Sequence, residues 1–280
     1  IVLNPILLFS SDGTFNSFDL EATLTHEIGH LLGLGHSQVL GSTMHKHQGR
    51  NGVYNLPNDS SRTLSEDDKA GAISLYGKRN FGKECCGNIN GKLTYQKEHL
   101  PKKLHVWAED FESGRVVAGI ETNSDGDFEL KGLPRSSFEL YAQDLVDQTE
   151  LVSLGTVDLS ETRSKNVETT ISYKETDFDI QFLGYNGQLS SLAVPVEAGK
   201  SYFIYLAGKN ISSKLHQVTF RSEHLKATKK GVLDHDYGVG ISVVSFEVVV
   251  DAQAKPGDYS PCLTNILGSA VCLSGGLSIE

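Results

Sequence analysis

The sequence contains no apolar stretch of the length that a membrane-spanning helix needs, about 18 residues or more. It also has no excess of basic residues, since 25 lysines and arginines stand against 35 aspartates and glutamates, for a formal net charge of −10. A basic surface that neutralises nucleic-acid phosphates is therefore not expected. We predict neither a membrane span nor a nucleic-acid partner.

A secretory signal and an initiator methionine are missing as well. The chain opens with IVLNPILLFS, which has neither the basic start nor the cleavage pattern of a signal peptide, and its single methionine is Met44. We interpret the chain as a segment of a longer one, so the missing signal carries no information about location.

Cysteines are few, and the four present form two pairs. In PCLTNILGSAVCL, two short strands flank a three-residue loop with Gly268 at its left-handed position, which places Cys262 opposite Cys272. A cross-strand disulfide is the favoured interpretation, and two small core residues are the alternative. Cys85 and Cys86 are adjacent, and a vicinal bridge, separate thiols and a bond to another chain all remain open. The even count in a loop-rich β protein favours an extracytoplasmic location.

Helical spacing of apolar residues is confined to the part of the chain before residue 78. SFDLEATLTHEIGHLLGL predicts one helix, with Ser17 or Asp19 at its start and Gly33 at its end. LSEDDKAGAISLYG predicts a second helix, whose acidic first turn suits the positive end of the helix dipole.

After residue 78 the pattern changes to short segments of alternating apolar and polar residues, typical of strands. KLHVWAED, RVVAGIET, DFELKG and SFELYAQ form a first series, and a second begins with FDIQFLG and SYFIYLAG. The Asp-Gly pair in TNSDGDFEL predicts a hairpin turn rather than a calcium loop, because the spaced ligands and the closing glutamate are missing. Two consecutive β-sandwiches fit this order of elements.

The stretch HEIGHLLGLGH contains three histidines and a glutamate within one helix and its end. His26 and His30 are one helical turn apart and point the same way, with Glu27 beside them. Gly33 can adopt a positive φ and turn the chain, so that His36 completes a three-histidine site with an open fourth position, as a catalytic zinc requires. The alternative is an amphipathic helix whose histidines only make local hydrogen bonds.

The extended stretch HEIGHLLGLGHS, with serine after the third histidine, resembles the matrixin branch of the metzincin zinc proteases. Met44 in GSTMHKH stands where a matrixin carries its Met-turn, and LSEDDKAGAISLYG is similar to the closing helix of that family. The three motifs occur in the family's order, and the resemblance covers residues 1–77.

The resemblance implies peptide hydrolysis by one Zn²⁺ ion held on the three histidines. The zinc would activate a water molecule and polarise the scissile carbonyl, and Glu27 would accept the proton of the water as general base. Met44 would form a packed floor beneath the histidines. Asp67 and Asp68 would either hydrogen-bond loops below the site or act only on the helix dipole.

Two departures from the family pattern affect what we expect. The upper subdomain of a matrixin would precede His26 by far more residues than are present, and residues 1–4 (IVLN) are expected to be its one remaining strand. We predict no second zinc, and any calcium would belong to the missing part. Second, His45, Lys46 and His47 replace the family's Tyr-Pro wall. We expect His45 and His47 to be exposed loop residues, with spare metal ligation as the alternative.

The predicted fold class is multidomain, a partial α+β metzincin catalytic segment followed by two all-β sandwich domains. Residues 1–78 would be the carboxy-terminal part of a matrixin-like zinc peptidase domain, and residues 79–86 a linker. Residues 87–174, with AGIETNSDGDFELKGLP, resemble the prealbumin-like, carboxypeptidase-regulatory type of sandwich. Residues 175–280 resemble an immunoglobulin-like sandwich in the rhythm of their strands.

The function that follows from the resemblance is a secreted zinc-dependent metalloendopeptidase that cleaves extracellular proteins. The alternative is an extracellular adhesive protein with a remnant or inactive protease segment, which the retained Glu27 disfavours. The β domains could bind an extracellular surface or matrix ligand. For Trp107, Tyr141 and Tyr205, packing within the sandwiches is favoured over a ligand-binding patch.

Overall fold

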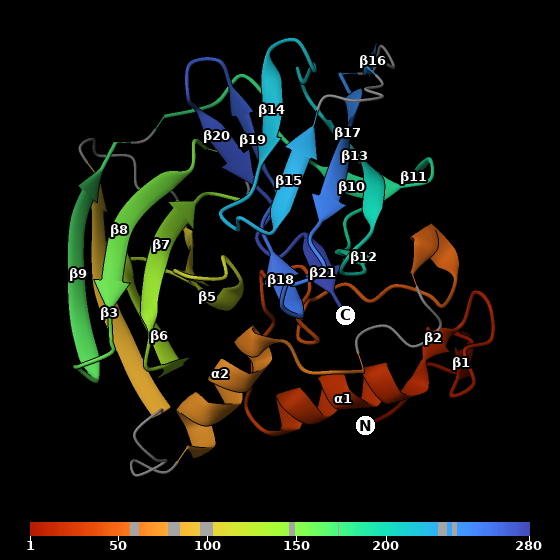
Figure 1. Ribbon diagram of the computed structural model, residues 1–280. Coiled ribbons are helices and arrows are strands. Elements are labelled where there is room, and N and C mark those ends of the chain that lie inside the picture. The colour runs from red at the N-terminus through yellow and green to blue at the C-terminus, as the bar shows by residue number, and fades with distance from the viewer. Residues whose placement is uncertain are drawn as a thin grey trace.

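A computed structural model describes the arrangement of the chain in an α+β segment and two β units (Figure 1). The described residues are 1–56, 62–77, 85–95, 103–145, 149–172, 174–228, 234–236 and 240–280. Among them, no helix combines the length and apolar character that crossing a membrane would require. The predicted linker at 79–86 lies outside the described residues except for its last two.

Helix α1 (Leu20–Leu31) carries the first two histidines of the motif. Asp19 caps its start, accepting a hydrogen bond from the Ala22 amide at 2.9 Å, and an ion pair of 2.6 Å with Arg62 holds the Asp19 carboxylate. At the other end, Gly33 has a φ of 95°. The positive φ ends the helix and turns the chain back towards it, as the sequence predicts.

Helix α2 (Glu66–Tyr76) begins in a capping box. The Ser65 hydroxyl accepts from the Asp68 amide at 3.1 Å, and the Asp68 carboxylate accepts from the Ser65 amide at 2.9 Å. This box places the buried Asp68 carboxylate at the start of the helix, under the loops that follow α1.

The remaining elements of the amino-terminal segment are short. Strand β1 (Phe9–Ser10) pairs in parallel with β2 (Phe18–Asp19), and η1 (Val53–Asn55) is a single 3-10 turn. The strand expected at residues 1–4 is wrong. Asn4 instead accepts hydrogen bonds from the amides of Ile6 and Leu7, the Ile1 side chain is exposed, and residues 1–4 pair with no strand among the described residues.

The first β unit consists of two sheets that enclose an apolar core, formed by side chains such as Ile89, Leu93, Phe138 and Leu140. One sheet has the order β6-β3-β9, with β3 at Cys85–Tyr95, β6 at Asp127–Pro134 and β9 at Ser164–Ile171. The other has the order β5-β4-β7-β8, with β4 at His105–Asp110, β5 at Val116–Glu121, β7 at Ser137–Gln143 and β8 at Val152–Asp158.

The hairpin predicted at TNSDGDFEL is wrong in its pairing, although the turn is present. Gly126 donates to the Asn123 carbonyl at 3.1 Å and has a φ of 81°, so the chain reverses at the Asp-Gly pair. The two flanking strands, β5 and β6, lie in different sheets. The turn carries the chain across the core, because β6 takes β3 as its antiparallel partner.

The second β unit is likewise built from strands around one apolar core, which includes Phe178, Ile180, Leu206 and Phe246. Its main sheet has the order β11-β10-β13-β17-β15, and β16 pairs with β17 as well. The bounds of these strands are β10 Phe182–Tyr185, β11 Gln188–Ser190, β13 Ser201–Gly208, β15 Leu225–Thr228, β16 Asp234–Asp236 and β17 Ser242–Val250. Opposite lie two three-stranded sheets, β12-β21-β18 (Val194–Val196, Leu277–Ile279, Gly257–Tyr259) and β14-β19-β20 (His216–Thr219, Cys262–Asn265, Ala270–Cys272). The multidomain fold class is confirmed.

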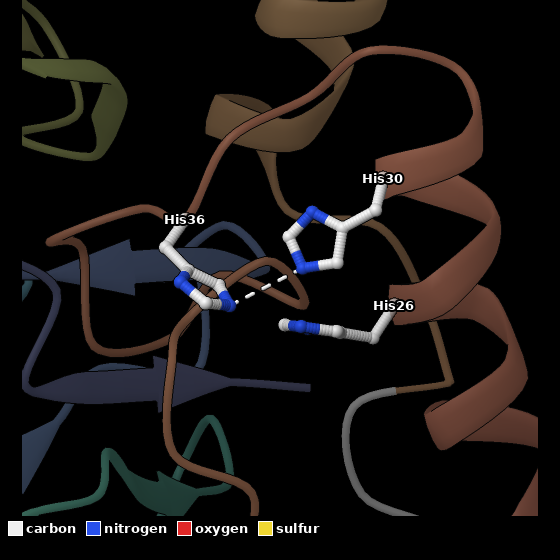
Figure 2. A group of neighbouring side chains, drawn as sticks. All are labelled: His26, His30 and His36. Atoms are coloured by element: carbon white, nitrogen blue, oxygen red, sulfur yellow. Dashed lines mark hydrogen bonds between the residues drawn. The ribbon is translucent and has the colours of Figure 1, made fainter. Parts of the chain in front are cut away.

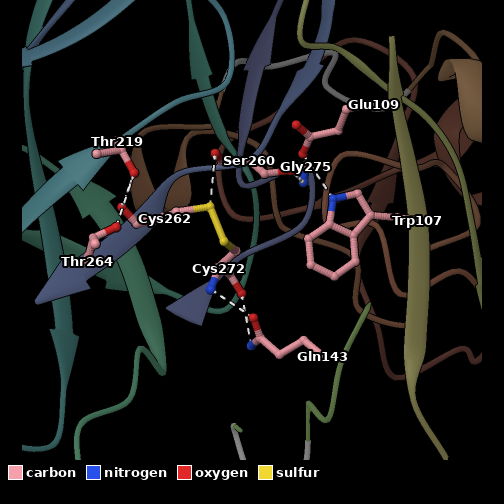
Figure 3. Close-up of a disulfide and its surroundings, with 9 residues drawn as sticks. All are labelled: Trp107, Glu109, Gln143, Thr219, Ser260, Cys262, Thr264, Cys272 and Gly275. Atoms are coloured by element: carbon pink, nitrogen blue, oxygen red, sulfur yellow. Dashed lines mark hydrogen bonds between the residues drawn. A yellow bond between two sulfur atoms is a disulfide. The ribbon is translucent and has the colours of Figure 1, made fainter. Parts of the chain in front are cut away.

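All four cysteines form disulfides. Cys262 and Cys272 face each other across β19 and β20 and are bonded, with Gly268 at a φ of 89° in the connecting turn. The bond lies beside Trp107 and Gln143 of the first β unit (Figure 3). Cys85 and Cys86 are bonded to each other, which is the vicinal alternative that the sequence left open.

The two β units contact each other through buried side chains. The side-chain Oε1 of Gln143 accepts from the Cys272 backbone amide at 2.9 Å, and Trp107 and Cys272 belong to the same buried apolar cluster. Trp107 also donates its indole N–H to Glu109 at 2.9 Å. The packing interpretation of Trp107 is confirmed, since its side chain is 1% exposed.

The buried carboxyl of Glu109 should make the free energy of unfolding decrease as the pH rises. Burial raises the pKa of this carboxyl from 4.5 to about 7, so between these values the unfolded chain loses a proton that the folded chain keeps. Each rise in pH across this window therefore favours the unfolded state. We expect Glu109→Gln to remove this contribution, so that the melting temperature of the variant minus that of the parent increases between pH 4.5 and 7.5.

Glu129→Gln is the matched control, because Glu129 is exposed and forms an ion pair with Lys131 at the surface. Its melting temperature should follow that of the parent at every pH. Parallel profiles for Glu109→Gln and the parent would show that Glu109 is not the titrating group.

Candidate metal centre

The three histidines of the motif converge on one point, although they come from two different local structures. His26 and His30 project from successive turns of α1, and His36 reaches back from the loop after Gly33 (Figure 2). One nitrogen from each ring can be chosen so that all three lie within 4.8 Å of one another. The ring centroids are 4.7 to 5.3 Å apart.

Backbone carbonyls fix the orientation of the two helical imidazoles. His26 Nδ1 lies 2.7 Å from the Thr43 carbonyl oxygen, and His30 Nδ1 lies 2.9 Å from that of Leu34. Each Nδ1–H donates to its carbonyl, which leaves Nε2 unprotonated and available as a ligand. Hydrogen bonds of this kind are the usual outer support of histidine ligands to metals.

The donor set fits a zinc ion. Zinc binds imidazole nitrogen at about 2.0–2.1 Å, so two nitrogens on a tetrahedral ion stand roughly 3.4 Å apart. His30 Nε2 and His36 Nε2 are 3.2 Å apart. Partial desolvation and the neighbouring His30 and His26 lower the pKa of His36, which favours the neutral imidazole that binds metal. His36 is exposed, so one side of the site faces solvent.

Glu27 lies beside the three histidines on α1. It is half-buried, and its negative charge acts on His36, where it opposes the lowering of the pKa. Glu27 directly follows the first histidine of the motif. It is therefore our candidate for the residue that transfers a proton at this site.

Met44 is buried and packs closely against Gly29 of α1. A Cβ atom at Gly29 would collide with the Met44 sulfur atom. Gly29 was not singled out in the sequence, although a glycine inside a helix costs roughly 1 kcal/mol relative to alanine and so often marks a packing requirement.

Asp68 fixes the turn that contains Met44. Its carboxylate accepts hydrogen bonds from the Thr43 amide at 2.9 Å, the Met44 amide at 3.1 Å and the Ser42 hydroxyl. Because Thr43 also provides the carbonyl that orients His26, the carboxylate is connected to the metal centre through one residue. Of the two interpretations of this acidic pair, the hydrogen-bonding one holds for Asp68.

Asp67 connects the loop after His36 to the first β unit. Its carboxylate accepts from the Ser37 hydroxyl at 2.6 Å and from the Gly119 amide of β5 at 2.7 Å. Burial raises the pKa of Asp67 to about 6, and the neighbouring Asp68 acts in the same direction. The contact with Gly119 joins segments far apart in the sequence, so no local pattern could predict it.

The expectation for His45 is wrong. The side chain is 6% exposed, its Nδ1 lies 3.3 Å from the His47 carbonyl oxygen, and burial lowers its pKa to about 4. His45 directly follows Met44, in the turn that is held by hydrogen bonds to the buried Asp68 carboxylate. The polar HKH sequence does not indicate that His45 is buried there. His47 is exposed, as predicted.

The loop between His36 and Met44 is also held by both β units. Val39 is fully buried in the apolar cluster that contains Trp107 and Cys272, and the Leu40 amide donates to the Ser274 carbonyl at 2.9 Å. The loop that supplies the third histidine is therefore held in place by both β units.

Comparison with known sequences places this centre in a family context. Residues 9–77 match the sequence model of the matrixin family. Rat matrilysin is 40% identical over 70 residues, which are 25% of this chain and 24% of matrilysin. Metalloendoproteinase 1-MMP of Arabidopsis thaliana is 44% identical over 59 residues, which are 21% of this chain and 14% of that protein. The chain thus spans about a quarter or less of these relatives, and the match supports a metalloprotease at the level of the family.

Among solved structures, the D312A form of BcpA, the major pilin subunit of Bacillus cereus, matches over 66% of each chain. The TM-score is 0.25 and the sequence identity 12%, so this is a weak likeness.

Replacing Asp68 should loosen the turn beneath the histidines. Asp68→Ala removes a buried carboxylate that accepts from the Thr43 and Met44 amides and from the Ser42 hydroxyl, and we expect the free energy of unfolding to fall by roughly 3 kcal/mol. Zinc affinity should fall as well, because Thr43 no longer holds the His26 ring. Chemical denaturation and competitive zinc titration measure the two effects.

Glu66→Ala provides the control on the same helical turn, since Glu66 makes a surface ion pair of 3.0 Å with Lys69. Such a pair contributes about 0.5 kcal/mol or less. If both variants lost the same stability, the Asp68 hydrogen bonds would not support the turn.

Proposed function

We propose that the chain carries the zinc-binding and catalytic part of a metalloendopeptidase that hydrolyses peptide bonds. The observation that carries the proposal is the convergence of His26, His30 and His36, whose ligand nitrogens lie within 4.8 Å of one another. The matrixin match over residues 9–77 supports it at the family level.

The chain's own residues have distinct tasks in this proposal. His26, His30 and His36 would hold a zinc ion, which would supply a Lewis acid that lowers the pKa of a water molecule. Glu27 accepts the proton of that water on its carboxylate and passes it to the nitrogen of the leaving amine. The carbonyls of Thr43 and Leu34 keep the two helical rings oriented, and Met44 fills the space below them.

The proposal extends to location and substrate. The Cys262–Cys272 disulfide supports an oxidising, extracellular setting, in which the substrates would be extracellular proteins and the two β units would bind a surface or matrix ligand. We retain the prealbumin-like and immunoglobulin-like interpretations, with boundaries at 87–174 and 175–280, as part of this proposal. The adhesive protein with an inactive site is less well supported, because a structural zinc site has no need of Glu27.

Glu27→Ala, made in the full-length protein, separates metal binding from catalysis. We expect the zinc content to remain at one ion per chain, because the three ligands are unchanged. Cleavage of casein should fall by about 10²- to 10⁴-fold, the usual contribution of a general base. Zinc is measured by elemental analysis and cleavage by the release of soluble peptide.

Glu21→Gln is the control on the same helix, because Glu21 is exposed and forms a long surface ion pair of 3.5 Å with Arg62. It should cleave casein at the parental rate. Parental activity in Glu27→Ala would disprove the role of Glu27, and the absence of zinc from the parent would disprove the metal centre itself.

A further inference from the structure

A cavity of about 580 Å³ lies between the candidate metal centre and the second β unit. His26 lines it on the side of α1, together with Ala22. The loop around Met44 contributes residues from Leu40 to Gly49. The cavity therefore begins at a ligand of the metal centre and extends away from it, and its size is within the 300–1,000 Å³ typical of ligand pockets.

The far wall of this cavity belongs to the second β unit. The residues that this unit contributes lie in or directly beside β12, β18 and β21, and they are Leu192, Ala193, Pro195, Pro256, Gly257, Asp258, Ser278, Ile279 and Glu280. Figure 1 shows β12, β18 and β21 at the end of this unit that faces α1. A segment more than 140 residues from the histidines in sequence thus forms part of the space next to them.

The wall is fixed by close contacts with the metal-centre segment. A Cβ atom at Gly41 would overlap the Asp258 carboxylate, and one at Gly49 would come within 2.8 Å of a Leu192 methyl carbon. Leu56 packs against Gly49 from the same side. The second β unit cannot move away from the cavity without breaking these contacts.

The lining is mixed, and its aliphatic part can receive an apolar side chain. Its cations already have partners: Arg62 pairs with Asp19 at 2.6 Å, and Lys69 pairs with Glu66 at 3.0 Å. Nine of the lining residues are aliphatic, namely Ala22, Leu40, Leu56, Leu64, Leu192, Ala193, Pro195, Pro256 and Ile279, and the others include the carboxylates of Glu66, Asp258 and Glu280. Burial of a large apolar side chain against such a surface stabilises a complex by the hydrophobic effect.

We propose that the second β unit forms the far wall of the substrate-binding cavity, and that Ala193 determines how large an apolar substrate side chain can enter. This inference rests on the proposed peptidase function. It gives the second β unit a direct part in substrate selection, in addition to any binding at its outer surface. Ala193 is suited to this task because it lines the cavity, is half-buried, and has only a methyl side chain.

Ala193→Phe tests the proposal by filling the cavity from its far wall. The probes are fluorogenic peptides of one sequence in which each position beside the scissile bond carries Ala, Leu or Trp in turn. At one of these positions, we expect the ratio of kcat/KM for the Trp peptide to that for the Ala peptide to fall by at least about 10-fold relative to the parent. Cleavage of the Ala peptide should fall less than cleavage of the Trp peptide.

Ala252→Phe is the matched control, since it places the same side chain on an exposed residue of the same unit. Its peptide preference should equal that of the parent. Zinc content and melting temperature are recorded for each variant, and if Ala193→Phe does not fold, Ala193→Val replaces it with a smaller shift expected in the same direction.

The outcomes separate this inference from the function on which it rests. A folded, zinc-loaded Ala193 variant with the parental preference at every position would overturn the proposal while leaving the peptidase intact. A parent that contains zinc but cleaves none of the peptides, nor casein, would instead overturn the proposed function and this inference with it.

Discussion

The loop from His36 to Met44 is held by two neighbouring carboxylates, and the candidate metal centre depends on this restraint. His26 and His30 need only the geometry of α1 to face the same way, but His36 lies outside the helix. Asp68 fixes the Met44 end of the loop by accepting hydrogen bonds from the amides of Thr43 and Met44, and Asp67 fixes the His36 end by accepting one from Ser37. A metal ligand that is displaced by a fraction of an ångström binds more weakly. These contacts therefore determine whether the imidazole of His36 lies at the same point as those of His26 and His30.

The same loop is where the α+β segment and the two β units meet, so the β units support the centre and are more than appended modules. Val39 inserts between Trp107 of the first unit and Cys272 of the second, and its side chain is completely buried. The Gln38 side-chain amide donates to Glu121 at 2.9 Å on one side, and the Leu40 amide donates to a carbonyl on the other. Contacts of this kind leave little freedom for the relative motion that is usual between domains joined by a polar interface.

The parts of the site that follow from local geometry could be predicted from the sequence, and those that depend on distant segments could not. The spacing of His26 and His30 and the bend at Gly33 follow from the period of a helix and from the φ values open to glycine. The contact of Asp67 with Gly119, by contrast, joins two units that no local pattern relates. The turn at TNSDGDFEL shows the same limit in the fold, because turn residues indicate where a chain reverses but not which sheet the next strand joins.

The buried carboxylate of Asp67 fixes the position of the loop after His36 more than it stabilises the folded chain. Its carboxylate accepts two hydrogen bonds, which would lower the pKa, yet burial raises the pKa to about 6, so the loss of hydration outweighs those bonds. An apolar residue of similar size would avoid that loss, and buried charged groups are often replaced in this way without a cost in stability. No apolar side chain could accept from the Ser37 hydroxyl and the Gly119 amide at once, however. The two directed bonds set the distance between the loop after His36 and the first β unit, which dispersion contacts alone would leave free to vary.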